Sequence, residues 1–137
     1  MESHKFSAGT VSRVGNVMKI VYDKDSEVTL DDMKEITAIR ENLFGEENYC
    51  SLIDLRKEFL SLSPEAKKFA AENPNVLKFR VAEVLLVKNF AQKLGVQTYV
   101  KLFRKDPVRV FSDEAKAMKW LETEFNYNIS KKGFGAN

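Results

Sequence analysis

The chain has 137 residues, 44% of them hydrophobic and 31% charged, and its formal net charge is +2. This size and balance predict one globular domain with a hydrophobic core, and the small net charge argues against a nucleic-acid-binding protein. No apolar run approaches the roughly 20 residues that span a membrane, and the first ten residues have no signal-peptide core. The single cysteine, Cys50, cannot form an internal disulfide, which favours a cytoplasmic location.

The first half of the chain begins with two short strands and a helix. Residues 6–14 alternate loosely in polarity and Val17–Tyr22 is a clear strand, so the intervening Gly15-Asn16 predicts a β-hairpin. Thr29 is a good N-cap for a helix whose apolar residues recur every three to four positions, and Gly45 is suited to end that helix.

The stretch from Tyr49 to Ala66 joins a strand to a helix. The apolar run that begins at Tyr49 and ends at Asp54-Leu55 predicts a buried central strand. Ser63 and Pro64 predict a helix start, because serine accepts a free backbone N–H and proline needs none at the first helical position. The charged connector between strand and helix lies where open α/β sheets usually carry their sites.

The second half alternates strands with helices. Residues 79–87 form a strand that is apolar on both parities near its end, which predicts that both of its faces are covered. Asn89 is a candidate cap for residues 90–103, where Gly95 leaves open one helix or two. A strand at 108–111 precedes a last helix that reaches residue 125. The sequence therefore predicts one domain over residues 1–125 and a loosely ordered tail over 126–137.

The sequence carries no recognisable catalytic motif. The only histidine is His4, and no Walker A loop, GxGxxG or CxxC pattern occurs. We therefore expect a protein that is not an enzyme, with no catalytic residue, cofactor or metal site. Ser61 and Ser63 are candidate phosphoacceptors, because a phosphate at the start of a helix meets free N–H groups and a favourable dipole. The alternative interpretation of Ser63 is a plain N-cap.

Several local patterns, together with the order of elements, resemble a known family. The patterns are the strand Val17–Tyr22, the helix start Thr29-Leu30-Asp31-Asp32, the strand end Leu52-Ile53-Asp54-Leu55, the strand Arg80-Val81-Ala82-Glu83-Val84, and Val108 to Ala115 with Trp120-Leu121. From about Val11 to Phe125 the chain resembles SpoIIAA-like proteins, the STAS and anti-sigma-factor-antagonist group with its SEC14-like bacterial relatives. The resemblance implies an α/β fold, a SpoIIAA-like (βα) superhelix with a mixed, mostly parallel sheet of about five strands and about four helices mainly on one face.

The same resemblance implies a non-enzymatic binding or regulatory module. Anti-sigma antagonists carry an Asp-Ser-Ser-Gly-type motif after the central strand, and a kinase partner phosphorylates a serine there. Here that motif falls at Leu62-Ser63-Pro64-Glu65, which puts Ser63 near the phosphoacceptor position, with the Asp and the Gly absent.

Two hypotheses about function follow. The first is a protein-interaction or regulatory module whose partner, another protein, contacts Arg56, Lys57 and Glu58 and the start of the following helix. The alternative is a domain that binds a small apolar or lipid-like ligand in a groove lined by Phe59, Leu60 and Leu62. The other interpretation of Phe59, Leu60 and Leu62 is that they pack the loop onto the core. Self-association as a homodimer is compatible with either hypothesis.

Overall fold

The computed structural model describes residues 3–23, 27–57 and 61–135. Within these ranges the chain forms six strands and five helices. In chain order they are β1 (Ser3–Phe6), β2 (Gly9–Val14), β3 (Val17–Tyr22), α1 (Leu30–Phe44), β4 (Tyr49–Asp54), α2 (Pro64–Glu72), α3 (Pro74–Phe79), β5 (Arg80–Leu86), α4 (Phe90–Phe103), β6 (Val108–Phe111) and α5 (Glu114–Gly135).

The six strands form one mixed sheet in the order β1-β2-β3-β4-β5-β6. The first three strands are antiparallel, and β3 to β6 run parallel to one another. The predicted hairpin is confirmed: Val14 pairs with Val17 across the turn, where Gly15 has a φ of +61° that suits a residue without a side chain. The expectation for the N-terminus omitted β1, in which His4 pairs with Val11.

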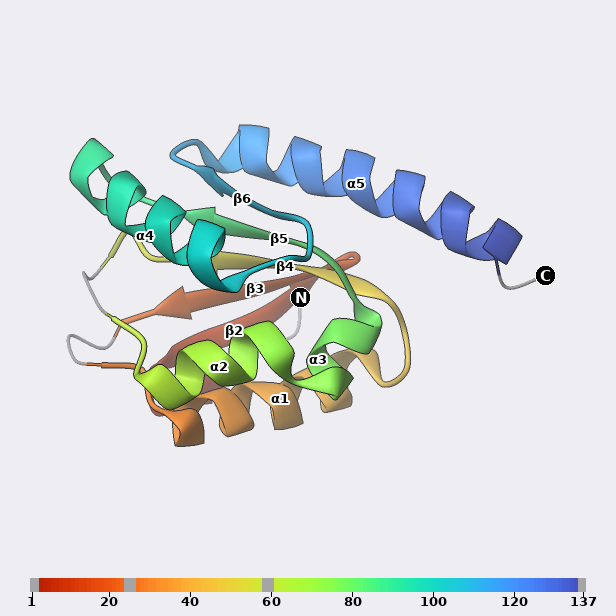
Figure 1. The fold of residues 1–137 in the computed structure, drawn as a ribbon. Helices are drawn as coiled ribbons and strands as arrows, with labels where there is room; N and C mark the ends of the chain where they lie inside the picture. Colours follow the sequence, from red (N-terminus) through yellow and green to blue (C-terminus); the bar gives the residue numbers. More distant parts are fainter. Residues whose placement is uncertain (1–2, 24–26, 58–60, 136–137) are drawn as a thin grey trace.

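Helices cover both faces of the sheet, with four on one face and one on the other (Figure 1). Helix α5 packs on β4 and β5, where Cys50, Leu52 and Val84 meet Ala117 and Leu121. Helices α1 to α4 lie on the opposite face. Every residue of β5 is buried, so the prediction that both of its faces are covered is confirmed.

Side-chain caps fix where the helices begin. Thr29 and Asp32 form a reciprocal capping box at α1, and Ser63 accepts the backbone N–H of Ala66 at α2. Asn89 caps α4, which is a single helix rather than two. Asn73 both ends α2 and caps α3, a helix that was not predicted from the sequence, with Pro74 at the first helical position.

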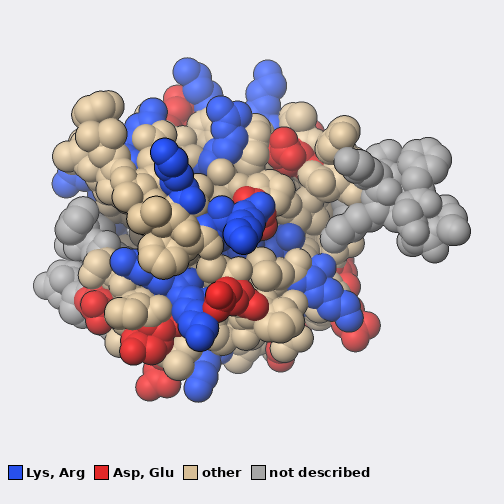
Figure 2. Space-filling view, in the orientation of Figure 1, with Lys and Arg blue, Asp and Glu red and all other residues tan. Residues whose placement is uncertain are grey.

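The C-terminal helix α5 continues past residue 125 to Gly135. The division into a domain ending at 125 and a separate tail stays a prediction. Figure 2 shows basic and acidic side chains together on the face that carries α2 and α4, with no field of a single sign. This mixture is in keeping with the net charge of +2.

Candidate ligand-binding cavity

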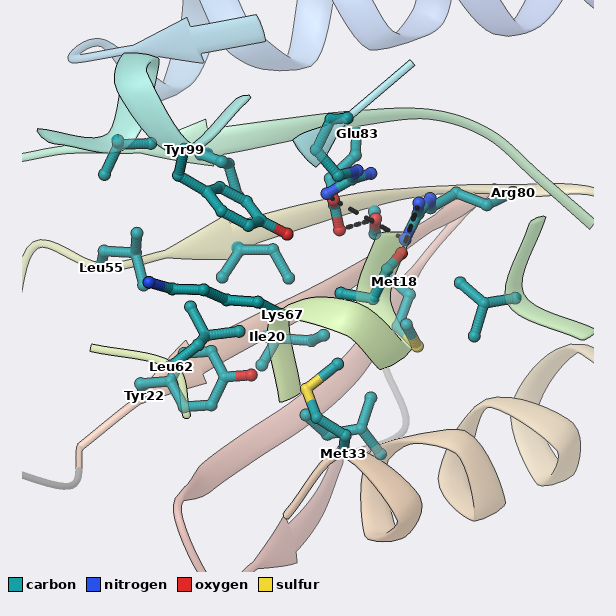
Figure 3. A pocket seen from close by; sticks show the side chains of 18 of the residues that line it. Met18, Ile20, Tyr22, Met33, Leu55, Leu62, Lys67, Arg80, Glu83 and Tyr99 are labelled. Carbon is teal, nitrogen blue, oxygen red and sulfur yellow. Dashed lines mark hydrogen bonds and ion pairs between the residues drawn. The ribbon is translucent and has the colours of Figure 1, made fainter. Parts of the chain in front are cut away.

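A cavity of about 310 Å³ lies between the sheet and the helices on the face opposite α5 (Figure 3). Its floor consists of side chains from β3, β4 and β5, and its walls come from α1, α2, α3 and α4. Most of the lining is apolar, and its apolar part includes Met18, Ile20, Met33, Ile36, Ile53, Leu55, Leu62, Ala70, Val76, Leu85, Ala91 and Val96. A space of this kind suits the apolar body of a small molecule.

One end of the cavity is polar and is organised around Glu83 on β5. Its two carboxylate oxygens accept hydrogen bonds from Ser51 Oγ at 2.7 Å and from Arg104 Nη1 at 2.6 Å. Arg80 Nη1 lies 3.7 Å from the same carboxylate. Asp106 binds both arginines, Arg104 through two hydrogen bonds and Arg80 through one of 2.8 Å. Two cations and two anions are thus held together beneath α4.

These pairs keep Glu83, Asp106 and Arg104 charged despite their burial. Burial alone favours the neutral acid, but Arg80 and Arg104 hold the pKa of Glu83 below its ordinary value. Burial likewise raises the pKa of Asp106, but the two arginines outweigh this effect and lower the pKa to about 2. Burial disfavours the charge of Arg104, yet Glu83 and Asp106 raise its pKa above the ordinary value. A buried charge is tolerated only when it is paired, as here.

Two buried polar atoms at this end have no hydrogen-bond partner among the described residues: Arg80 Nε and the Tyr99 hydroxyl oxygen. Burial raises the pKa of Tyr99, so its hydroxyl stays protonated at neutral pH. Figure 3 shows Tyr99 and Lys67 extending over the cavity from α4 and α2. Buried donors without a partner are costly, and an acceptor supplied by a ligand would satisfy them.

Helix α4 forms a roof over the cavity and is weakly embedded. Its only buried side chain is Gln92, which donates from Nε2 to the Leu55 carbonyl at 3.0 Å and accepts from the Lys88 backbone N–H at 2.7 Å. Val96 and Tyr99 face the cavity on the following turns. A roof with so little burial can open at low free-energy cost.

The structure brings some of the predicted site residues to the cavity. Leu62 and Ser61 line it, at the point where Val28 and Leu62 form an isolated bridge. Ser63 is buried and serves as the N-cap of α2, so its hydroxyl is enclosed in this conformation, and phosphorylation of Ser63 or Ser61 stays a prediction.

Two of the predicted partner-contact residues, Arg56 and Lys57, do not line the cavity. Arg56 forms ion pairs of 2.9 Å with both Asp54 and Glu114 and so ties the end of β4 to the start of α5. Lys57 is exposed. Glu58, Phe59 and Leu60 lie outside the described residues, so the partner-contact and groove predictions for them stay untested.

The sequence interpretation missed the polar end of the cavity. A signal was present, because Arg80 and Glu83 stand in a strand that was predicted to be covered on both faces. Charged residues in such a strand must find buried partners. Their buried partners include Arg104 and Asp106, which the chain brings back to β5 after α4. Local sequence patterns do not reveal that contact.

Neither a metal-binding cluster nor a membrane-spanning helix occurs in the described part of the chain. No cluster of three or more histidine, cysteine, aspartate or glutamate residues that could hold a metal ion occurs there. No helix there has the length and apolar character needed to cross a membrane.

Comparison with known proteins first identifies the class of fold. An uncharacterised protein of the DUF3478 family from Shewanella loihica PV-4, which has a SpoIIAA-like fold, matches this structure with a TM-score of 0.55. The match covers 84% of this chain and 92% of that chain at 20% identity. The protein thus has an α/β, SpoIIAA-like fold, as the resemblance predicted.

The family follows from the sequence itself. Residues 12–124 match the sequence model of a domain of unknown function, DUF7793, and the chain belongs to that family. No curated protein matches the chain.

Proposed function

We propose that this domain is a non-enzymatic binding module that takes up a small amphiphile in the cavity beneath α4. The observation that carries the proposal is an apolar cavity of about 310 Å³ with a polar end that holds unpaired donors. At ~30 Å³ for each water-sized group, this volume accommodates roughly ten non-hydrogen atoms. A medium-length apolar chain with one polar head fits that description.

The polar head is proposed to be a hydrogen-bond acceptor, best a carboxylate. Arg80 and Arg104 are balanced by Glu83 and Asp106, but Arg40 and Lys67 also line the cavity, and no described acidic side chain other than Glu83 lines it. Lys67 makes no ion pair with any described residue, and its ammonium lies 5.9 Å from the centre of the Phe103 ring. An excess of basic groups favours a negatively charged head over a neutral one.

A titration of isotopically labelled protein with medium-chain probes tests this proposal. Decanoate is expected to shift the amide resonances of residues at the cavity floor, such as Ile20 and Ile53, in a saturable manner. Butyrate should bind at least about 100-fold more weakly, because each methylene contributes ~0.8 kcal/mol. 1-Decanol should bind about tenfold more weakly than decanoate, because hydrogen bonds to a charged group are stronger.

A cavity-filling variant provides the control. Ile53→Trp places a large ring in the cavity and should abolish the saturable shifts, whereas Val14→Trp, at an exposed strand end outside the cavity, should leave them unchanged. If Ile53→Trp loses its native circular dichroism, Val96→Phe on α4 serves in its place. Binding that survives both cavity-filling variants, or that never saturates, contradicts the proposal.

The first functional hypothesis, contact with another protein through the connector after β4, also stays a proposal. Lys57 remains available to a partner, but Arg56 is held by two intramolecular ion pairs. A cytoplasmic location and a homodimeric state likewise stay predictions. The cavity therefore carries the more specific of the two proposals.

A further inference from the structure

The outward side of α4 exposes an unusual amount of apolar surface. Phe90 is 72% exposed, Leu102 is 70% exposed and Leu94 is 51% exposed. Phe90 and Leu94 are one helical turn apart and share a face, and Leu102 lies toward the side of that face on the last turn. Large apolar side chains gathered on one element mark an interaction surface more often than single exposed residues do.

The same segment is basic and contains no acid. Residues 88–105 include Lys88, Lys93, Lys101, Arg104 and Lys105, and no aspartate or glutamate. Arg104 is turned into the buried cluster, whereas Lys88, Lys101 and Lys105 are exposed. Figure 2 shows uncharged surface bordered by basic side chains over α4, at the upper left. A short helix that combines exposed apolar and lysine side chains is suited to a membrane surface.

We propose that α4 is a docking surface for an anionic lipid bilayer. Its apolar side chains would enter the boundary between headgroups and acyl chains, while its lysines would contact the negatively charged headgroups. Charge complementarity selects this occupant, because the segment 88–105 carries five basic and no acidic residues and also presents the exposed apolar side chains of Phe90, Leu94 and Leu102. The proposal does not depend on the cavity holding a ligand.

The position of α4 adds a consequence. The helix that would touch the bilayer is also the roof of the apolar cavity, and one buried side chain, Gln92, anchors it. Docking would therefore place the cavity beside the membrane interface. It would also bring the weakly embedded roof to the place where an amphiphile could enter or leave.

Co-sedimentation with vesicles at 0.15 M salt tests the surface. The wild-type protein is expected to bind vesicles of equal parts phosphatidylcholine and phosphatidylglycerol and to bind pure phosphatidylcholine far more weakly. Phe90→Ser/Leu102→Ser should weaken binding about tenfold or more. The matched control Val14→Ser/Leu77→Ser, which changes exposed apolar side chains elsewhere, should leave binding unchanged.

The charges are tested in the same assay. Lys101→Gln/Lys105→Gln should weaken binding about fivefold for each lysine removed, since a lysine near an anionic surface contributes ~1 kcal/mol. Lys34→Gln/Lys116→Gln, on α1 and α5, is the matched control. An equal loss of vesicle binding in the two double variants would mean that net charge alone attracts the protein, and it would overturn the assignment to α4.

Depth of insertion gives a second readout. The only tryptophan, Trp120, lies on α5 against Phe111, so a Phe90→Trp/Trp120→Phe variant carries its only indole on α4. Its emission should shift to shorter wavelength with anionic vesicles. No binding to those vesicles overturns the proposal. So does a dimer that Phe90→Ser/Leu102→Ser dissociates, because the surface would then serve a second copy of the chain.

Discussion

The ion-pair cluster beneath α4 leads to a quantitative prediction for Glu83→Gln. The substitution keeps the shape of the side chain and the acceptor for Ser51, but it removes the negative charge and replaces the oxygen that accepts from Arg104 with an amide NH2, which cannot accept. Glu83 and Arg104 are 6% and 1% exposed at their side chains, so the charge of Arg104 cannot be solvated by water when its partner is lost. The variant therefore reports the loss of one buried carboxylate charge together with the hydrogen bond that it accepts from Arg104.

The magnitude follows from what remains of the cluster. Removing one partner of a buried ion pair costs about 3–5 kcal/mol. Asp106 still binds both Arg80 and Arg104 in the variant, so the lower end of that range applies. We expect a loss of about 3 kcal/mol in the free energy of unfolding, which corresponds to a decrease in Tm of roughly 10 °C for a domain of this size.

Urea denaturation followed by circular dichroism measures the change. The midpoint should fall while the slope stays constant, because the surface exposed on unfolding is the same. Glu122→Gln, at an exposed position of α5, is the control and should change stability by less than about 0.5 kcal/mol. A Glu83→Gln midpoint equal to that of Glu122→Gln would refute the claim that the cluster depends on its buried charge.

Three further predictions concern single residues. A carboxyl whose pKa is lowered on folding stabilises the fold above its unfolded pKa of ~3.9 and loses that contribution as the pH falls through its folded value, here about 2 for Asp106. Between pH 5 and pH 2 the Asp106→Asn variant should therefore lose about 1 kcal/mol less of its free energy of unfolding than the wild-type protein, after allowance for the partial exposure of this carboxyl. An equal loss in the two proteins would contradict this prediction. Cys50 is fully buried and burial raises the pKa of its thiol to about 12, so a thiol reagent should modify it in urea but not in the native protein; rapid native modification would count against the packing of α5. Gly95→Ala should stabilise the protein by about 0.5–1 kcal/mol in thermal unfolding, because no atom lies near the added methyl group and alanine favours the helix; destabilisation would show that α4 is not a regular helix there.

The elements that the sequence predicted best are those whose boundaries depend on local chemistry. Thr29 and Asp32 cap α1, Ser63 caps α2 and Asn89 caps α4, each through contacts with residues no more than three positions away. Their effect does not depend on the rest of the fold, so a sequence pattern is enough to find them.

The elements that the sequence did not predict depend on contacts made elsewhere. Strand β1 consists of Ser3 to Phe6, whose pattern is weak, and it is a strand because it pairs with β2. Helix α3 was not predicted, because Asn73 followed by Pro74 suits either the end of one helix or the start of the next. In both places the local signal allows more than one structure, and tertiary contacts decide between them.

The cavity was predicted only in outline. Leu62 was a candidate for an apolar groove and does line the cavity, but most of the lining comes from side chains of seven helices and strands. The partners of Glu83 are 32 positions before it, at Ser51, and 21 positions after it, at Arg104. Such distant contacts are set by the order of strands in the sheet, which periodicity and caps do not specify.

Native mass spectrometry of the protein, purified gently from the cells that produce it, tests the central claim most directly. We predict a species heavier than the polypeptide by the mass of one small amphiphile, and we predict that Ile53→Trp, purified in the same way, lacks the added mass while keeping its native circular dichroism. The polypeptide mass alone in the wild-type preparation, or the same added mass in wild type and Ile53→Trp, would contradict a ligand bound in the cavity beneath α4.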